Sequence, residues 1–335
     1  MKKALKLSLG AIVLSNLLIL PSALATSSNT QESIHFVAPP ATFNPLNAIN
    51  DELKKYGFPE KPNDPKELSV WKDHMSHAKH FIPPVLKTVV GTTHKTHVKS
   101  TSDTYTPNWS GWVATPNSGF SFAKIAGDFY ATDISSSTVD SHVSSWVGLG
   151  GLNNSKLIQA GVEGVATTHW LSSTTTAYYV WTEMLPDQPY EQQISSFPIN
   201  SGDHLYVHIV YGTHQDSSGN TIGDATFYIE NLTQNNYTYY ATSTLNATND
   251  YYGGTAEWID ERPTVNGSYS NLAKFGTDTW TNLYAGTPSV SASLGSWANY
   301  PLNMRNPNNY NDLLAGPGSY NSASNLFVNY WYNYN

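Results

Sequence analysis

The chain of 335 residues contains no cysteine. Disulfide bonds and thiol-based catalysis are therefore excluded, and the core must hold by packing and hydrogen bonding alone. The chain also lacks a repeat of fixed period and any apolar run of the roughly 18 residues that a membrane-spanning helix needs. We therefore expect a protein without disulfide staples and without a membrane partner.

The N-terminus has the three parts of a secretory signal. Lys2, Lys3 and Lys6 are followed by a mostly apolar stretch over residues 7–20 and by the small-residue site Ala23-Leu24-Ala25. This order is typical of a signal peptide, here of bacterial type, cut after Ala25. We expect residues 1–25 to be removed and the protein to be secreted.

The remaining chain changes character near residue 102. Residues 26–102 hold nine lysines and seven acidic residues, a net charge of +2, whereas residues 103–335 hold five basic and eighteen acidic residues, a net charge of −13. The first part also contains six of the eleven histidines, which gain charge as the pH falls. Opposite charges should draw the two parts together at neutral pH.

The basic part carries the helix signals. Asp64, Pro65 and Glu67 are typical of an N-cap, a first helical position and a capping-box glutamate. One helical face then gathers four apolar residues before Pro83-Pro84 ends the run, namely Leu68, Trp71, Met75 and Ala78. We expect residues 26–102 to be a short, partly helical propeptide; a small N-terminal domain that stays attached is the alternative.

The acidic part has the pattern of an all-β domain. Short alternating runs separated by polar turns predict strands in an antiparallel β-sandwich over residues 103–287, and these runs are residues 144–149, 177–184, 204–211, 226–232 and 256–261. Residues 288–335 form an Asn- and Tyr-rich C-terminal extension. The sequence leaves open whether this extension adds strands or forms an aromatic surface layer.

Several common sites do not fit. Asp278-Thr279-Trp280 is not the turn that an aspartic peptidase needs twice, and no Gly-x-Ser-x-Gly turn is present. His204 and His208 share a strand face but stand about 13 Å apart, too far to hold one metal ion. The acidity of the second part argues against nucleic-acid partners. We expect neither a metal nor a cofactor.

An ordered series of short motifs remains, and each of them is weak alone. They are Asn108-Trp109-Ser110-Gly111, residues 145–151 (SWVGLGG), 157–162 (LIQAGV), 181–187 (WTEMLPD), 199–203 (INSGD), 229–233 (IENLT), 256–261 (AEWIDE) and Phe275-Gly276. In wording and order they resemble the glutamic peptidases, acid endopeptidases known as eqolisins. The resemblance spans residues 107–286 and implies a curved sandwich of the concanavalin or jelly-roll type.

The resemblance also implies the catalytic residues. It assigns Gln159 and Glu261 as the catalytic pair, and it places the substrate cleft at four further residues, namely Trp109, Trp146, Trp181 and Glu183. Because strand residues alternate between faces, Glu257 lies on the same face as Glu261 and is the other candidate base. Trp109, Trp146 and Trp181 also fit the plain role of core aromatics.

The implied pair makes chemical sense. A glutamate can take a proton from water and later give it to the leaving amine, while a glutamine NH₂ can hold the oxyanion at any pH. We therefore expect an acid-active endopeptidase that is a monomer, cuts proteins or peptides, and is inhibited by its own propeptide. Substrate preference stays open because Gly150, Leu185 and Pro263 depart from the family pattern.

Two other functions stay open at this stage. A glycoside hydrolase on a similar sandwich would pair Glu183 with Glu257 or Glu261, but it would leave Gln159 without a role. A carbohydrate-binding or adhesion protein would use exposed tyrosines and tryptophans without turnover, but it would leave the basic segment unexplained.

Overall fold

The computed structural model describes residues 34–96, 104–135, 139–152, 154–169, 174–244, 251, 253–287 and 290–334. The chain divides into two compact units, Met1–Glu32 and Ser33–Asn335, and only the second contains described residues. The expected signal peptide lies outside them. Within the described ranges, no helix is both long enough and apolar enough to cross a bilayer.

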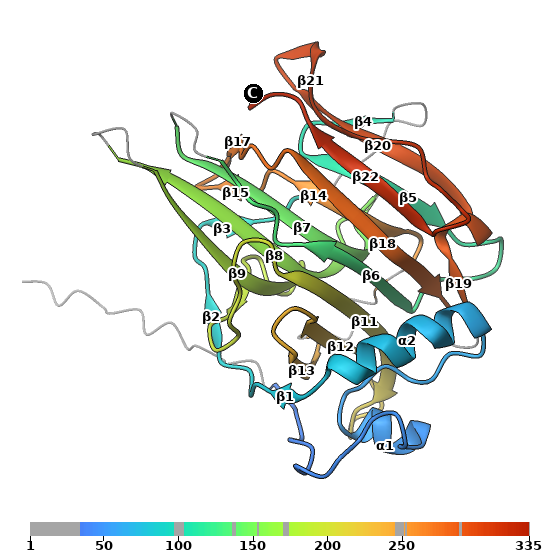
Figure 1. Cartoon of the computed structure of the whole chain (residues 1–335). Coiled ribbons are helices and arrows are strands. Elements are labelled where there is room, and N and C mark those ends of the chain that lie inside the picture. Colours follow the sequence, from blue (N-terminus) through green and yellow to red (C-terminus); the bar gives the residue numbers. More distant parts are fainter. Residues whose placement is uncertain are drawn as a thin grey trace, which may run out of the picture. The chain divides into compact units, whose positions relative to one another are not determined.

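Two large sheets, which β20 connects, build the second unit (Figure 1). The outer sheet contains, in order of pairing, β1 (His80–Phe81), β13 (Asn236–Ser243), β12 (Thr221–Asn231), β11 (His204–Gln215), β6 (Lys124–Tyr130), β18 (Thr277–Gly286), β22 (Leu326–Trp331) and β21 (Asn309–Pro317). The short β19 (Ser291–Ser293) pairs with β18. All these pairings except β1 with β13 are antiparallel.

The second sheet, called here the site sheet, contains β20 (Ala298–Asn306), β5 (Trp109–Thr115), β14 (Ala256–Glu261), β7 (Ser141–Gly150), β8 (Leu157–Thr168), β9 (Thr174–Leu185), β10 (Gln192–Ile194) and β2 (Leu86–Thr88). Its pairings in this order are antiparallel. Short strands β4 (Tyr105–Thr106) and β17 (Asn271–Leu272) run parallel to β20 and β7. A third, small sheet holds β3 (Thr92–Thr93), β15 (Thr264–Val265) and β16 (Ser268–Tyr269).

The core lies between the outer sheet and the site sheet. Alternation along β14 turns Trp258 toward this core and Ile259 toward the opposite face of the site sheet. The core draws large side chains from both sheets, including Phe129, Val147, Ile158, Phe227, Trp258 and Trp280. The expected antiparallel β-sandwich is confirmed. Four of the five expected strand runs lie within β7, β9, β11 and β14, and the fifth, residues 226–232, ends one residue beyond β12.

The C-terminal residues join both sheets. β20 pairs with β5 in the site sheet and with β21 in the outer sheet, while β22 pairs with β18. A short 3₁₀ helix, η1 (Leu294–Ser296), precedes β20. Of the two possibilities that the sequence left open for this tail, the structure therefore forms the strands.

The two α-helices of the described residues lie before the sandwich in the chain. They are α1 (Asn50–Lys55) and α2 (Pro65–His77), and Asp64 caps α2 by accepting from the backbone of Lys66 and Glu67. The expected capping-box role of Glu67 is wrong, because its carboxylate accepts a hydrogen bond from the Ser291 hydroxyl at 2.7 Å. A tertiary partner has replaced the local one.

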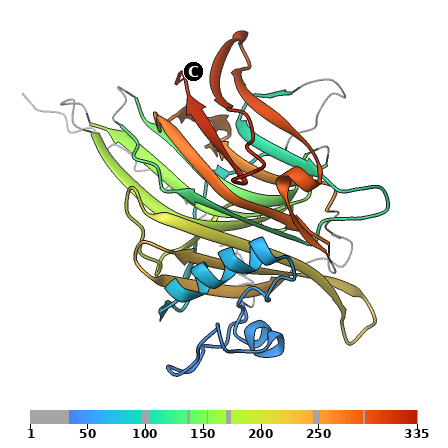
Figure 2. The same ribbon diagram turned by 45° about the vertical axis from the view of Figure 1, so that its right-hand side comes forward.

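Both helices pack on the outer face of the outer sheet. Figure 2 shows the yellow strands of this sheet between the green strands of the site sheet and the two blue helices. The contact buries Leu53, Phe58, Trp71 and Met75 from the helical segment against a row of aromatic side chains, namely Tyr206, Tyr228, Tyr237 and Tyr239. The apolar helix face expected from the sequence is thus the face that meets the sandwich.

A pair of buried carboxyl groups links the two sheets. Asp260 of β14 accepts hydrogen bonds from Ser145 Oγ at 2.6 Å and Asn329 Nδ2 at 2.7 Å. The fully buried Asp278 of β18 faces Asp260, and burial together with this neighbouring carboxylate raises the pKa of Asp278 well above its usual range. Burial also raises the pKa of Asp260, against the effect of these hydrogen-bond donors, so the pair shares a proton.

This pair predicts that the folded state is more stable in acid than at neutral pH. The unfolded chain ionises Asp278 above about pH 4, whereas the folded chain keeps it neutral, so stability from this group falls as pH rises. Asp278→Asn mimics the neutral form and should gain about 2 kcal/mol over the wild type at pH 7 but nothing at pH 3. Urea unfolding at both pH values measures this difference. The exposed Asp133→Asn is the matched control, and a gain of equal size at both pH values would contradict the assignment.

Candidate active site

One face of the site sheet gathers most of the residues that the sequence singled out. Backbone register places Ser144 of β7 opposite both Glu261 and Glu163, and it places Gly148 opposite both Gln159 and Glu257. These residues lie on the face turned away from the outer sheet, together with three fully buried tryptophans, Trp109, Trp146 and Trp181. We call this surface the site face.

Glu261 is held by donors from three directions. Asn108 Nδ2 donates to its Oε1 at 2.7 Å, Trp146 Nε1 donates to its Oε2 at 2.9 Å, and Nδ1 of His94 lies 2.8 Å from the same Oε2. The side chain is completely buried. Donors of this kind favour the charged carboxylate, which a general base requires.

Glu257, the other candidate base, has a different environment. Neither of its oxygens makes a hydrogen bond of ordinary geometry with the described residues. Burial raises the pKa of Glu257 well above its usual range, and the Thr255 hydroxyl opposes this only weakly. A carboxyl group kept neutral is a poor base, so the geometry favours Glu261.

Gln159 is oriented by its cross-strand neighbour Glu183. Gln159 Nε2 donates to Glu183 Oε2 at 2.7 Å, while Gln159 Oε1 has no partner among the described residues. Both side chains are fully buried, and burial raises the pKa of Glu183 to about 8 despite nearby His94. Glu183 is therefore neutral in acid and acts on Gln159 through a neutral hydrogen bond.

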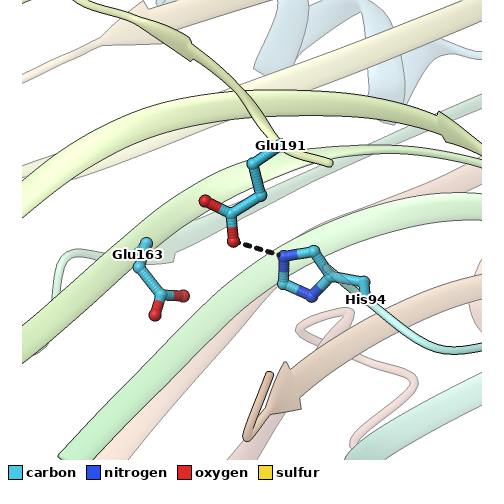
Figure 3. A group of neighbouring side chains, drawn as sticks. All are labelled: His94, Glu163 and Glu191. Atoms are coloured by element: carbon cyan, nitrogen blue, oxygen red, sulfur yellow. Dashed lines mark hydrogen bonds and ion pairs between the residues drawn. The ribbon is translucent and has the colours of Figure 1, made fainter. Parts of the chain in front are cut away.

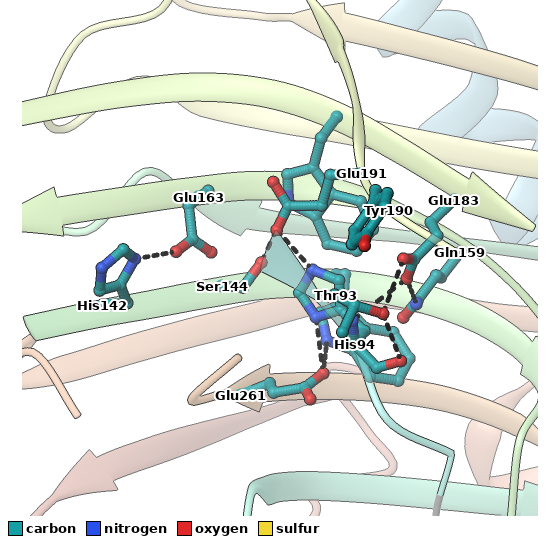
Figure 4. A network of polar contacts seen from close by, with 12 residues as sticks. Thr93, His94, His142, Ser144, Gln159, Glu163, Glu183, Tyr190, Glu191 and Glu261 are labelled. Atoms are coloured by element: carbon teal, nitrogen blue, oxygen red, sulfur yellow. Dashed lines mark hydrogen bonds and ion pairs between the residues drawn. The ribbon is translucent and has the colours of Figure 1, made fainter. Parts of the chain in front are cut away.

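His94, from the basic N-terminal segment, occupies the middle of the site (Figure 4). Its ring stacks on Trp181 with centroids 4.0 Å apart and planes 10° apart, between Glu261 and Glu191. Its Nε2 lies 2.8 Å from Glu191 Oε1. Burial alone would lower the pKa of His94, but Glu261 and Glu191 outweigh it and raise this pKa well above its usual range, so the ring is an imidazolium.

The residue before His94 reaches the other half of the site. Thr93 Oγ1 donates to Glu183 Oε1 at 3.2 Å, and the backbone N–H of His94 donates to Glu183 Oε2 at 3.3 Å. Thr92 and Thr93 form β3, which pairs antiparallel with β15, the strand that directly follows Glu261 in the chain. An extended piece of the N-terminal segment thus contacts both Glu183, the partner of Gln159, and Glu261 itself.

His94, Glu163 and Glu191 form the one group in the described part of the chain with a spacing suited to a metal ion, with ligand atoms within 4.8 Å of one another (Figure 3). Both ring nitrogens of His94, however, already pair with carboxylates. Glu191 also accepts from the Tyr179 hydroxyl at 2.7 Å. The two carboxylates thus balance the charge of a buried cation, which is the His94 imidazolium rather than a metal ion.

Glu163 continues this polar chain toward solvent. Its Oε1 lies 2.8 Å from His142 Nδ1, and the His142 side chain is 16% exposed. Burial raises the pKa of Glu163 to about 7, against the opposing effect of His142. Its other oxygen has no partner among the described residues. Glu163 is thus a proton-holding group beside the site.

The structure brings together all six residues expected from the sequence, Trp109, Trp146, Gln159, Trp181, Glu183 and Glu261, on or along the site face. Sequence reasoning missed His94, Asn108, Glu163 and Glu191 as site residues. Asn108 opens the first motif and Glu163 stands four residues after Gln159, on the same strand face. Those two positions could have been found, whereas His94 is one of six histidines in its segment.

Comparison with known proteins assigns the class. The family model of the Peptidase A4 family matches residues 107–315, so the chain belongs to this family of glutamic endopeptidases. This membership implies peptide hydrolysis. It argues against the two other functions considered from the sequence, a glycoside hydrolase and a carbohydrate-binding or adhesion protein. A search of curated proteins finds no match.

Comparison also finds solved structures that are similar to this chain. Scytalido-glutamic peptidase with a transition state analog inhibitor matches with a TM-score of 0.50 and 18% identity, over 68% of this chain and 98% of that one. SCP-B, a member of the eqolisin family in complex with the tripeptide Ala-Ile-His, matches with a TM-score of 0.47 and 17% identity, over the same shares. At this identity, the first match shows the sandwich fold alone.

The neutral state of Glu183 predicts a contrast between two substitutions. Glu183→Gln keeps a neutral acceptor for Gln159, so kcat in acid should stay within about tenfold of the wild type. Glu183→Ala removes the acceptor and should lower kcat about a hundredfold, as the loss of an aligned oxyanion donor does. Initial rates on a fluorogenic peptide at pH 4 measure both. Equal losses in the two variants would show that the charge of Glu183 is required.

Proposed function

We propose that the protein is a secreted acid endopeptidase made as a zymogen, with Glu261 as general base and acid and Gln159 as oxyanion donor. The observation that carries the proposal is the hydrogen bonding of Glu261. Asn108 and Trp146 hold this carboxylate from fixed strands, and its third partner, His94, belongs to a segment that can leave.

The reaction follows from this geometry. Once His94 has left, a water molecule can take the place of its ring next to Glu261 Oε2. Glu261 removes a proton from this water while the water oxygen attacks the peptide carbonyl carbon. Gln159 Nε2 donates a hydrogen bond to the developing oxyanion. Glu261 then returns the proton to the amide nitrogen as the C–N bond breaks, giving a carboxylic acid and an amine.

The tryptophan side chains of the site face support the proposal that an extended substrate binds there. Trp109 and Trp146 lie edge to face with centroids 5.0 Å apart, and Trp181 already stacks on the His94 ring. The strand β3 shows how an extended chain pairs with β15 beside Glu261. A protein or peptide substrate would take this course, and we propose the cleft roles of Trp109, Trp146, Trp181 and Glu183 on this basis.

The N-terminal segment supports the zymogen proposal. Residues 26–102 would be the propeptide that follows a signal peptide of residues 1–25, and the mature enzyme would be a monomer. The +2 and −13 charges of the two parts attract each other at neutral pH, and His94 concentrates that attraction in the site.

Acid would release this inhibition. The imidazolium of His94 is held by the negative charge around it, and acid removes part of that charge, because burial raises the pKa of neighbouring Glu163 to about 7. The same acid pH leaves Glu183 neutral and able to orient Gln159. Acidification therefore activates the enzyme by reducing the negative charge around His94, while Glu261 keeps its role as general base.

The catalytic pair is tested by three substitutions in acid-processed protein. Glu261→Gln and Gln159→Ala should each lower kcat about a thousandfold, because each removes a group that acts in the transition state. Glu257→Gln is the matched control on the same strand face and should stay within about tenfold. Hydrolysis of a denatured protein at pH 4 gives the rates, and circular dichroism checks folding. Full activity in both of the first two variants would overturn the pair.

The inhibitory role of His94 is tested in the intact precursor. His94→Ala removes both ion pairs, so the precursor should cut a fluorogenic peptide at pH 6 at least about tenfold faster than the wild type. His80→Ala, an exposed histidine of the same segment, is the control and should have no effect. If the His94→Ala precursor stays silent at pH 6, another part of the segment provides the inhibition.

A further inference from the structure

The N-terminal segment contacts the sandwich in two different ways. Residues 34–88, called here the docking part, cover the outer sheet and reach the edges of both sheets. Residues 89–96, called here the plug, enter the site with Thr93 and His94. The two parts therefore need not leave together.

The docking part is held mainly by apolar packing. Leu53 is fully buried, and Trp71 and Met75 are 4% and 1% exposed. Phe58 contacts the rings of Tyr237 and Tyr228 at centroid distances of 4.9 and 5.5 Å. Contacts of this kind do not depend on ionisation, so a fall in pH leaves them in place.

The docking part also completes both sheets. β1 pairs with β13 at the edge of the outer sheet, and β2 pairs with β10 at the edge of the site sheet. Without this segment, both edges would present unpaired backbone groups. The β2 contact adjoins the site, because its partner β10 begins at Gln192, the residue after Glu191. The plug continues this pairing, since the N–H of Val89 donates to the backbone oxygen of Glu191 at 2.9 Å.

One ion pair in the docking part is also suited to acid. His74 Nε2 of α2 lies 3.0 Å from Asp128 Oδ2 of β6, and both side chains are buried. Burial alone would raise the pKa of Asp128, but His74 and His204 outweigh it and lower this pKa. The other groups around His74 are Asp73 on its own helix and Glu230 on β12, and burial raises the pKa of Glu230 to about 8. In acid the pair therefore persists beside a neutral Glu230.

The plug has the opposite character. It contacts the site through two strand residues in β3 and through His94, which is paired with carboxylates; the acidic residues around it are Glu183, Glu191, Glu261 and nearby Glu163. Acid removes negative charge around the His94 imidazolium, because burial raises the pKa of Glu163 to about 7 and a carboxylate oxygen of Glu163 lies within 4.8 Å of a ring nitrogen of His94. The apolar contacts of the docking part do not depend on this charge. The pH that opens the site thus leaves the helices seated.

We propose that the docking part stays bound after processing as a second, non-covalent chain of the mature enzyme, and that only the plug leaves the site. This goes beyond the proposed zymogen function, in which residues 26–102 act only as an inhibitor. The retained chain would pair both sheet edges and hold β10, and with it Glu191, beside the catalytic face.

The test uses a cut that does not depend on the protein's own activity. A recognition sequence for a sequence-specific protease replaces residues 97–103 in a Gln159→Ala background, and the chain is cut at pH 7. Size-exclusion chromatography with mass spectrometry at pH 7 and pH 4 should then find the N-terminal fragment with the sandwich, one to one. A fragment that elutes alone at pH 4, while circular dichroism shows a folded sandwich, would overturn the proposal.

Brief pepsin treatment of the cut complex at pH 4 separates the two parts. Pepsin should trim residues after Thr88 and spare residues 34–88, whereas loss of the whole segment would contradict a docked chain. Trp71→Ala should raise the dissociation constant of the fragment at least about a hundredfold, and Lys72→Ala, the exposed neighbour on α2, should not change it. An unchanged constant in Trp71→Ala would also count against the proposal. A protein that docks in this way but never cuts peptides would leave the inference standing and refute the proposed function.

Discussion

The buried ion pairs of His94 are the interaction on which the described state of the site depends. An imidazolium with no exposed surface is unfavourable unless its charge is matched, and here Glu261 and Glu191 each lie 2.8 Å from one ring nitrogen. The match is valid only while the glutamates are ionised. A site built this way is closed by the same groups that it needs for chemistry, so inhibition and catalysis cannot occur at one time.

Buried carboxyl groups with raised pKa values also occur elsewhere in the fold. Glu163, Glu183 and Glu230 all have raised pKa values, about 7, 8 and 8, because burial disfavours their charged forms. Each is neutral at the acid pH where the family is expected to work. A chain without cysteine therefore gains stability in acid from carboxyl groups that would be a liability at neutral pH, and the shared proton of Asp260 and Asp278 between the sheets follows the same rule.

The sandwich and much of the site could be predicted because they follow from local patterns. Two-residue alternation fixes which face a strand residue takes, so Glu261 and Gln159 were bound to share a face once β7 lay between β8 and β14. Gly150 departs from the family wording, and its φ of +88° explains why a glycine suits that turn. Features that depend on local sequence pattern, such as the face a strand residue takes, can be predicted from the sequence alone.

The partners of these residues could not be read in this way. Glu67 has the right spacing for a capping box, yet it bonds Ser291, and His94 contacts Glu261 across 167 residues of chain. Nothing in the spacing of the histidines distinguishes the one that enters the site from the one that docks α2. That distinction arises from the position of each histidine relative to the sheets. His74 pairs with Asp128, whose pKa is lowered by His74 and His204 despite burial, whereas His94 lies beside Glu163, whose pKa burial raises to about 7. Two histidines of one segment thereby respond to acid in opposite ways.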